Sequence, residues 1–151
     1  DAALVSIGQG QLLMTPLNVA MMGAGIANGG KIMKPYIVES VTAASGVKMM
    51  QARTSEYSIP ISNETAEYMK ELMVGVVKNG TGSGARISGI TVAGKTGTAE
   101  NESDKDHAWF VGFAPAENPQ IAVAVILEYD GGAGGTNAAP VARNIMSKYL
   151  K

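Results

Sequence analysis

Apolar positions recur along the chain with two different periods, and these periods predict where helices and strands lie. A helical period predicts one helix with Thr15 as its N-cap and Pro16 at its first position; the helix continues over residues 17–27 and glycines follow its end. A second helix is predicted to follow Ser62 and to end at Asn79, just before a glycine. The stripe expected to be buried on this second helix consists of Ala66, Met69, Leu72, Met73, Val76 and Val77.

A period of two dominates the second half of the chain and predicts an antiparallel meander. Its strands are expected over residues 90–99, 107–113 and 120–129. The third of these is apolar on both faces, as in a central strand that is covered on each side. The face of the middle strand that carries its large side chains consists of Trp109, Val111 and Phe113, with Trp109 as a core anchor. A final helix is predicted over residues 137–150, with an inner stripe of Val141, Ile145 and Tyr149.

Two weaker patterns complete the predicted fold. The small residues of the first helix share one face and indicate tight packing; they are Ala20, Gly23, Ala24 and Ala27. Residues 31–51 read as an extended, hairpin-like segment with strand character at 36–38 and Val41, and with a turn at 44–46. The predicted fold class is therefore α/β (α+β), an antiparallel sheet with flanking helices.

Composition narrows the possible functions. The chain has 151 residues, a formal net charge of -1 and no cysteine. The near-neutral charge gives no electrostatic reason to expect nucleic acid. With no cysteine and one histidine, disulfides are excluded, and neither a metal site nor a cofactor is expected. The longest apolar run, residues 121–127, is far shorter than the ~20 residues that a membrane helix needs. Residues 1–10 lack the pattern of a signal peptide, and we expect the sequence to be part of a longer chain.

Residues 89–96 match two motifs that predict different chemistry. They fit the phosphate-binding pattern G-x-x-x-x-G-K-[ST] letter for letter. That motif, however, requires a flexible loop between a strand and a helix. The four residues between its glycines are strand formers, and no helical period follows Thr96.

The second motif is Lys-Thr-Gly-Thr at residues 95–98, a version of the K-T-G motif of β-lactamases and penicillin-binding proteins. Lys95 offers a cation, and Thr96 and Thr98 offer hydroxyl donors, to a substrate carboxylate. Gly97 has no side chain, so an extended peptide could pair with the strand there. An N–H group that follows this glycine could bind a developing oxyanion.

The sequence around this motif resembles the class B penicillin-binding proteins. The matching blocks occur in the family's order and cover nearly the whole chain: SIGQG at 6–10, TPL at 15–17, ANGG at 27–30, AGKTGTAE at 93–100 and HAWFVGFAP at 107–115. The resemblance implies a partial β-lactamase-like transpeptidase fold, with residues 1–151 forming the C-terminal part of the domain. It also implies a serine D,D-transpeptidase that cross-links peptidoglycan stem peptides ending in D-Ala-D-Ala and that β-lactams acylate. Its location would be the extracytoplasmic face of the bacterial membrane.

By this resemblance, Lys95, Thr96 and Thr98 orient the substrate carboxylate, and the backbone N–H of Thr98 helps to form the oxyanion hole. The family's nucleophile, the serine of Ser-x-x-Lys, and its Ser-x-Asn motif precede K-T-G. The chain has no Ser-x-Asn. Ser45 begins a Ser-x-x-Lys in letters only, because it lies in the predicted turn. Residues 103–105 imitate part of Ser-Asp-Asn in a polar loop after the K-T-G motif. We therefore predict that the chain alone is inactive and is not acylated by penicillin.

Three kinds of protein remain possible at this point: a transpeptidase fragment, a non-catalytic module whose exposed strand binds a peptide or a partner, and a nucleotide-binding protein. His107 lacks a positioned nucleophile and an orienting partner, and is predicted to cap its strand or contact water. In the family the sheet also contains strands from the N-terminal half of the domain. Residues 120–129 would then lack a neighbour, so we expect dimers or pairing with that half.

Overall fold

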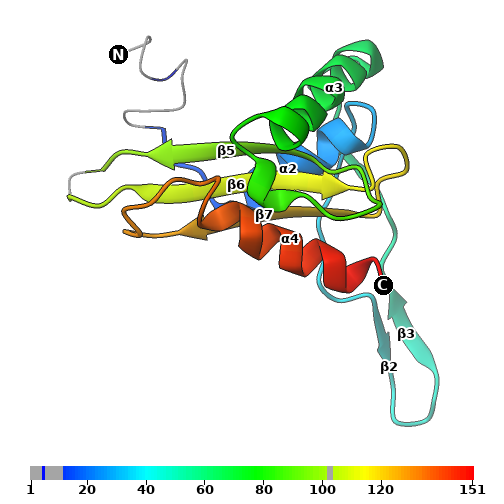
Figure 1. Cartoon of the computed structure of the whole chain (residues 1–151). Coiled ribbons are helices and arrows are strands. Elements are labelled where there is room, and N and C mark those ends of the chain that lie inside the picture. The colour runs from blue at the N-terminus through cyan, green and yellow to red at the C-terminus, as the bar shows by residue number, and fades with distance from the viewer. Residues whose placement is uncertain (1–4, 6–11, 102–103) are drawn as a thin grey trace.

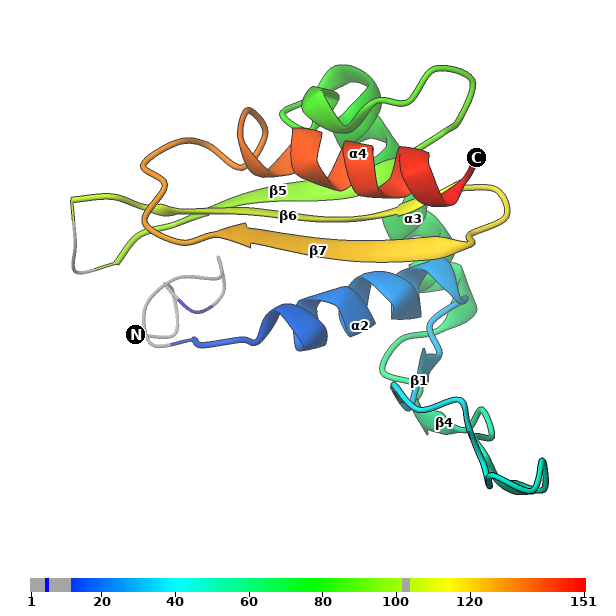
Figure 2. The ribbon, with the colours of Figure 1, turned by 90° about the horizontal axis from the view of Figure 1, so that it is seen from below.

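A three-stranded antiparallel sheet forms the centre of the chain. The structure is a computed structural model that describes residue 5, residues 12–101 and residues 104–151. The sheet has the order β5–β6–β7, with β5 at Ala93–Ala99, β6 at His107–Ala114 and β7 at Ile121–Leu127. Helix α2 (Pro16–Ala27) covers one face and helix α4 (Ala138–Tyr149) covers the other (Figure 2). The predicted fold class, an antiparallel sheet with flanking helices, is confirmed.

Helices α2 and α3 begin where the sequence predicted caps. The Thr15 hydroxyl accepts a hydrogen bond of 3.2 Å from the N–H of Asn18 at the start of α2. The Ser62 hydroxyl accepts one of 3.1 Å from the N–H of Thr65 at the start of α3 (Asn63–Asn79). These bonds satisfy N–H groups that have no partner inside the helix. Helix α3 lies beside β5 (Figure 1).

Side chains alternate across the middle strand and divide the core between the two faces of the sheet. Phe110 lies on the α4 face, packed in one cluster with Val125 and Met146. Phe113 lies on the α2 face, in a second cluster that includes Met73 from α3. Phe110, Phe113 and Met146 are fully buried, and burying a side chain of this size contributes about 1.5–3 kcal/mol.

The small residues of α2 allow the close packing that the sequence predicted. A Cβ atom added at Gly23 would lie 2.8 Å from Cγ2 of Val111 on β6. Real Cβ atoms are not found that close to a neighbour, so α2 can approach β6 at this point only with glycine. Val111 and Phe113 therefore share the α2 face, as predicted.

The inner stripe predicted for the last helix is wrong. Val141, Ile145 and Tyr149 are 39%, 45% and 64% exposed. The residues of α4 that face the sheet are instead Ala138, Ala139, Ala142 and Met146, all fully buried. Small alanines let the helix lie close above β6 and β7, so the residues in contact are not the largest ones.

The stripe predicted for α3 is correct at Ala66, Met73 and Val77, which are buried. It is wrong at Met69 and Leu72, which are 38% and 50% exposed. A single sheet edge accepts only part of a wide apolar stripe. Met69 and Leu72 therefore face away from the sheet.

The segment between α2 and α3 forms two small antiparallel pairs instead of one long hairpin. Strand β1 (Ile32–Met33) pairs with β4 (Glu56–Ser58), and β2 (Ser40–Thr42) pairs with β3 (Lys48–Gln51). The hairpin of β2 and β3 projects away from the sheet (Figure 1). Its turn lies at 44–46, as predicted, but the strand predicted at 36–38 does not form. Among the described residues no strand pairs with residues 36–38, and the Ile37 side chain is fully exposed.

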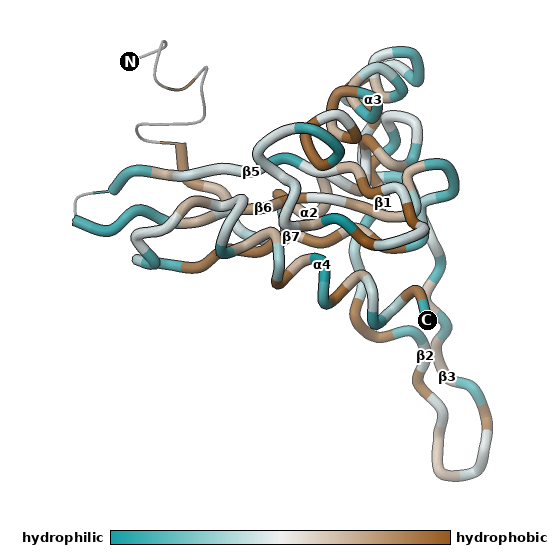
Figure 3. The backbone as a smooth tube through the Cα atoms, viewed as in Figure 1, coloured by the Kyte–Doolittle hydropathy of each residue, from teal (hydrophilic) through white to brown (hydrophobic). Residues whose placement is uncertain are grey.

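Two sheet boundaries also differ from the prediction. Strand β5 begins at Ala93 instead of residue 90, because Ile90 pairs with Ile87 in an isolated bridge just after the short 3-10 helix η1 (Ser83–Ala85). Strand β7 is covered by helices on both faces, as predicted, but among the described residues it is an edge strand and pairs only with β6. Most of it has the hydrophobic colour in Figure 3.

Candidate substrate-binding strand

The K-T-G-T residues occupy the second half of β5, where the strand has β6 on one side only. Among the described residues, β5 pairs with no other strand. The pairing with β6 shows which face each residue occupies. Lys95 and Gly97 lie opposite Val111 and Trp109, on the α2 face. Thr96 and Thr98 are opposite Phe110 and Ala108, and share the α4 face. The Lys95 and Thr98 side chains are exposed, while Thr96 is half-buried.

A cleft of about 560 Å³ runs along this part of β5. It is lined by all four K-T-G-T residues, by Thr81 from the loop after α3, and by Leu12, Met14 and Val19 before and within α2. The cleft thus combines one cation, several hydroxyl groups and an apolar wall. This combination suits an extended ligand that has a carboxylate at one end.

Two hydrogen bonds fix polar groups at this cleft. The Lys95 ammonium donates to the carbonyl oxygen of Thr96 at 2.5 Å. The hydroxyl oxygens of Thr81 and Thr96 lie 2.8 Å apart and share a hydrogen bond. The sequence pointed to Lys95, Thr96, Gly97 and Thr98 but not to Thr81. Only the fold brings Thr81, 15 positions earlier, beside the motif.

A glycine-rich loop supports the α4 side of the cleft. Residues 131–135 lead into α4 and pass over β5 and β6 (Figure 1). A Cβ atom at Gly134 would overlap the carbonyl oxygen of Gly97, and one at Gly135 would overlap the carbonyl oxygen of Thr81. Side chains at these positions would push the loop away from the motif and from Thr81.

The geometry is incompatible with the phosphate-loop hypothesis. Lys95 and Thr96 lie inside strand β5, and the next element is strand β6 instead of a helix. The N–H groups of a strand alternate in direction and cannot wrap one phosphate as a loop does. The nucleotide-binding alternative is therefore wrong.

The other candidate groups do not assemble a catalytic site in the described residues. Ser45 and Gly46 form the turn between β2 and β3, where Gly46 has φ of +84°. Ser103 lies outside the described residues. His107 begins β6, and its Nδ1 accepts a hydrogen bond of 2.9 Å from the N–H of Tyr129. No group of three or more His, Asp or Glu side chains in the described part of the chain could hold a metal ion.

Trp109 has a different place from the one predicted. It is half-buried and lines the cleft beside the K-T-G-T residues. Its backbone lies opposite Gly97 on the facing strand. A Cβ atom at Gly97 would lie 3.2 Å from Cβ of Trp109. The indole thus forms part of the cleft beside β5 and is only partly a core residue.

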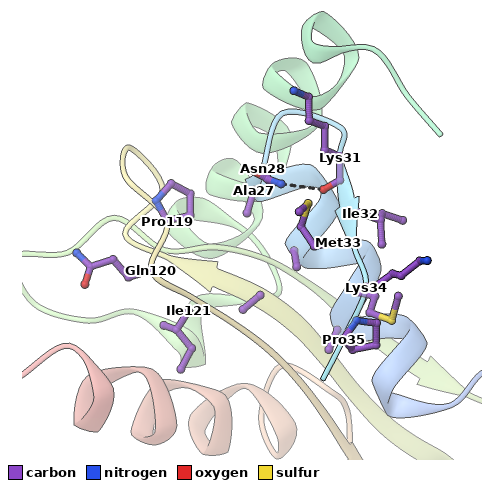
Figure 4. Close-up of a pocket in the computed structure, with 14 residues that line it drawn as sticks. Ala27, Asn28, Lys31, Ile32, Met33, Lys34, Pro35, Pro119, Gln120 and Ile121 are labelled. Carbon is purple, nitrogen blue, oxygen red and sulfur yellow. Dashed lines mark hydrogen bonds between the residues drawn. The ribbon is translucent and has the colours of Figure 1, made fainter. Parts of the chain in front are cut away.

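A second groove, of about 540 Å³, lies between α2, the β1 segment and the loop before β7 (Figure 4). Lys31 and Lys34 border it, together with Pro119, Gln120 and Ile121 at the start of β7. Asn28 donates a hydrogen bond of 3.0 Å to the carbonyl oxygen of Lys31 there. None of the K-T-G-T residues lines this groove, so it is separate from the candidate site.

Comparison with known proteins assigns the family. The model of the penicillin-binding protein transpeptidase domain matches residues 1–147. The chain belongs to this family. Within it, the chain is 38% identical to the peptidoglycan D,D-transpeptidase PbpA of Mycolicibacterium smegmatis, over 100% of this chain and 33% of the relative. It is 35% identical to the peptidoglycan D,D-transpeptidase MrdA of Acinetobacter baumannii, over 97% of this chain and 24% of the relative.

Solved structures agree with this transpeptidase assignment. The structure of PBPA from Mycobacterium tuberculosis matches with a TM-score of 0.91 and 38% identity, over 100% of this chain and 38% of that one. The penicillin G acyl-enzyme complex of penicillin-binding protein A from the same species matches with a TM-score of 0.89 and 36% identity, over 98% of this chain and 34% of that one. The chain thus spans between about a quarter and two fifths of the length of these relatives. The SIGQG block at 6–10 lies outside its described residues.

Proposed function

We propose that this chain supplies the substrate-binding strand of a serine D,D-transpeptidase whose nucleophile lies in a preceding segment. The single observation that supports this most strongly is the K-T-G-T sequence on an edge strand that faces a cleft. An extended stem peptide ending in D-Ala-D-Ala could pair with the open edge of β5. The Thr96 and Thr98 hydroxyls share the α4 face, and Lys95, on the α2 face, lines the same cleft; together they would bind the terminal carboxylate.

The reaction follows from this placement. The serine oxygen of the preceding segment attacks the carbonyl carbon between the two D-Ala residues and loses its proton. Terminal D-Ala leaves with a proton on its nitrogen, and an acyl-enzyme remains. The amine of a neighbouring stem peptide then displaces the serine and forms the cross-link. The Thr98 N–H would stabilise the oxyanion in both steps. β-Lactams would form the same acyl bond with their ring carbonyl.

Intact-protein mass after incubation with benzylpenicillin tests this function. The chain alone should gain no adduct, because it has no Ser-x-Asn and its one Ser-x-x-Lys pattern, at residues 45–48, lies at the turn between β2 and β3 instead of at a helix start. The preceding half, expressed separately, should gain one penicillin per serine nucleophile only when this chain is present. An adduct on this chain alone would make one of its own serines the nucleophile and would contradict the proposal. No adduct on either half when mixed would leave the K-T-G-T strand as a binding module without catalytic function.

The free edge of β7 supports a second part of the proposal, a partner for this strand. Strand β7 has the sequence IAVAVIL and pairs only with β6 among the described residues. A bare apolar edge favours pairing with another strand. That strand would come from the preceding half of the same domain or, in its absence, from a second copy. Sedimentation of the isolated chain should show concentration-dependent dimers, and a monomer at all concentrations would contradict self-association.

The location of the whole protein is also proposed from the family. Peptidoglycan cross-linking takes place outside the cytoplasmic membrane, so the extracytoplasmic face is the expected site of action. None of the helices in the described residues is long and apolar enough to span a bilayer. Labelling of whole cells with a fluorescent penicillin that does not cross the membrane would test this expectation.

A further inference from the structure

The Thr81–Thr96 hydroxyl pair is the feature of the cleft that the K-T-G-T motif alone does not explain. Their oxygen atoms lie 2.8 Å apart, and both residues line the cleft with Lys95 and Thr98. A hydroxyl group has one hydrogen to donate and two lone pairs that accept. If the Thr96 hydroxyl donates its hydrogen to a carboxylate, it can only accept from Thr81, so the Thr81 hydroxyl must be the donor in the bond between them.

We infer that Thr81 is a positioning residue for carboxylate recognition: it donates to Thr96 and so directs the Thr96 hydrogen toward the ligand. This inference rests on the function proposed above. A chain of two hydroxyl groups is cooperative, because the donor to Thr96 polarises the O–H that Thr96 offers. Thr81 need not touch the ligand to have this effect.

The end of α3 holds Thr81 in place. The N–H groups of Gly80 and Gly82, on either side of Thr81, both donate to the carbonyl oxygen of Val76, at 3.1 and 3.0 Å. Arg86 closes the loop by donating to the carbonyl oxygens of Val77 and Lys78, at 3.0 and 2.7 Å. Thr81 lies in a short loop after α3, and four hydrogen bonds thus attach this loop to the last turn of the helix.

The loop before α4 fixes the same residue from the opposite side. Gly135 lies against the Thr81 carbonyl, and a Cβ atom there would also lie 3.5 Å from Cγ2 of Thr96. A Cβ atom at Gly84 would lie 2.5 Å from the carbonyl oxygen of Gly135. Because both loops are packed this closely, the separation of Thr81 and Thr96 is set by the fold and not by chance side-chain rotation.

The test compares Thr81→Val with wild type in the transpeptidase domain reconstituted from both halves. Valine keeps the shape of threonine and removes its hydrogen-bond donor. Acylation by benzylpenicillin should slow by about 2- to 12-fold, the loss expected for one neutral hydrogen bond. Acylation by benzylpenicillin methyl ester, which has no carboxylate, should be equally slow in both proteins. Thr81→Ser keeps the hydroxyl and should restore the wild-type rate.

The outcomes separate this inference from the proposed function. If the wild-type domain is not acylated at all, the proposed function is wrong. If it is acylated and Thr81→Val reacts equally fast with benzylpenicillin, only the inference is wrong. An equal loss with the ester would show a general structural effect and would also overturn it. Should Thr81→Val fail to fold, Thr81→Ala, which also removes the donor, provides the second measurement: it should slow acylation by benzylpenicillin but not by the methyl ester, and a wild-type rate with benzylpenicillin would overturn the inference.

Discussion

The two outer strands of the sheet leave very different edges open. Strand β5 carries a cation, two hydroxyls and a glycine on the two faces beside its open edge, and these residues line a cleft. Strand β7 presents the apolar sequence IAVAVIL, with helices on both faces. An edge that binds a small ligand needs polar side chains to orient it, whereas an edge that another strand completes needs unpaired backbone N–H and C=O groups with apolar side chains beside them. The contrast indicates a ligand for β5 and a protein segment for β7.

The largest expected effect comes from removing the cation of the β5 edge. Lys95→Ala should slow benzylpenicillin acylation of the reconstituted domain by about 10- to 150-fold, because a hydrogen bond to a charged group is worth about 1.5–3 kcal/mol. Stopped-flow or time-resolved mass measurements give the rate. The melting temperature should change little, since the Lys95 side chain is exposed.

Lys34→Ala is the matched control for this variant. Lys34 is also an exposed lysine, but it borders the separate groove beside α2. Its removal should leave the acylation rate at the wild-type value. Equal losses in the two variants would mean that general charge, and not the β5 edge, determines the rate.

The next effect concerns the loop that supports the β5 edge. Gly135→Ala should lower the free energy of unfolding by about 1–3 kcal/mol, because the added methyl group would overlap the Thr81 carbonyl in a closely packed region. Gly75→Ala is the control with the opposite sign. Gly75 lies inside α3 with no atom within 4 Å of an added Cβ, so alanine should raise the free energy of unfolding by about 0.5–1 kcal/mol. Urea denaturation measures both values, and a loss at both positions would contradict this account of Gly135.

At the β7 edge, a charge should weaken pairing with another strand. Ile126 is a half-buried residue of β7, opposite Trp109. Ile126→Lys should weaken dimers of the isolated chain by about tenfold, or about 1.4 kcal/mol, because charged side chains protect sheet edges against pairing. Sedimentation gives the dimer constant. Tyr57→Lys, at an exposed position of β4, is the control and should leave that constant unchanged.

The sequence predicted the elements well because caps and glycines are local signals. Thr15 and Ser62 start helices through side-chain bonds to residues three positions later, so the chain itself records both helix starts. The K-T-G-T motif was found for a similar reason: its chemistry lies in four consecutive residues. The chain order of the motif blocks then identified the family.

The sequence failed where the answer depends on distance between elements. In α4, positions 138, 142 and 146 and positions 141, 145 and 149 have the same spacing, so periodicity alone cannot choose between them. Side-chain size favoured the wrong set, since close packing against the sheet selects alanine. Thr81 was missed because its role depends on Thr96, which only the folding of α3 onto β5 brings near it.

The smallest predicted effect concerns a contact that joins the starts of the two edge strands. Thr91 precedes β5, and Glu117 lies in the turn that leads to β7. A hydrogen bond from the Thr91 side chain, with smaller contributions from the backbone of Glu117 and the charge of Lys70, lowers the pKa of the Glu117 carboxyl; burial opposes this shift. The N–H of Ala116 also donates to the Thr91 carbonyl at 2.8 Å, so the two segments stay together without the carboxylate.

The sign of the pH effect follows from the lowered pKa of Glu117. The unfolded chain binds this proton more readily than the folded one, so the ionised carboxylate stabilises the fold above its ordinary pKa of about 4.3. That contribution is lost as the pH falls through the lower, folded-state pKa. Glu117→Gln should therefore be slightly less stable than wild type at pH 7 and equally stable at about pH 2, with Thr91→Val showing the same convergence. If the difference in free energy of unfolding between wild type and Glu117→Gln stays constant with pH, the charge of Glu117 does not contribute to stability. The segments before β5 and β7 would then be joined only through their backbones.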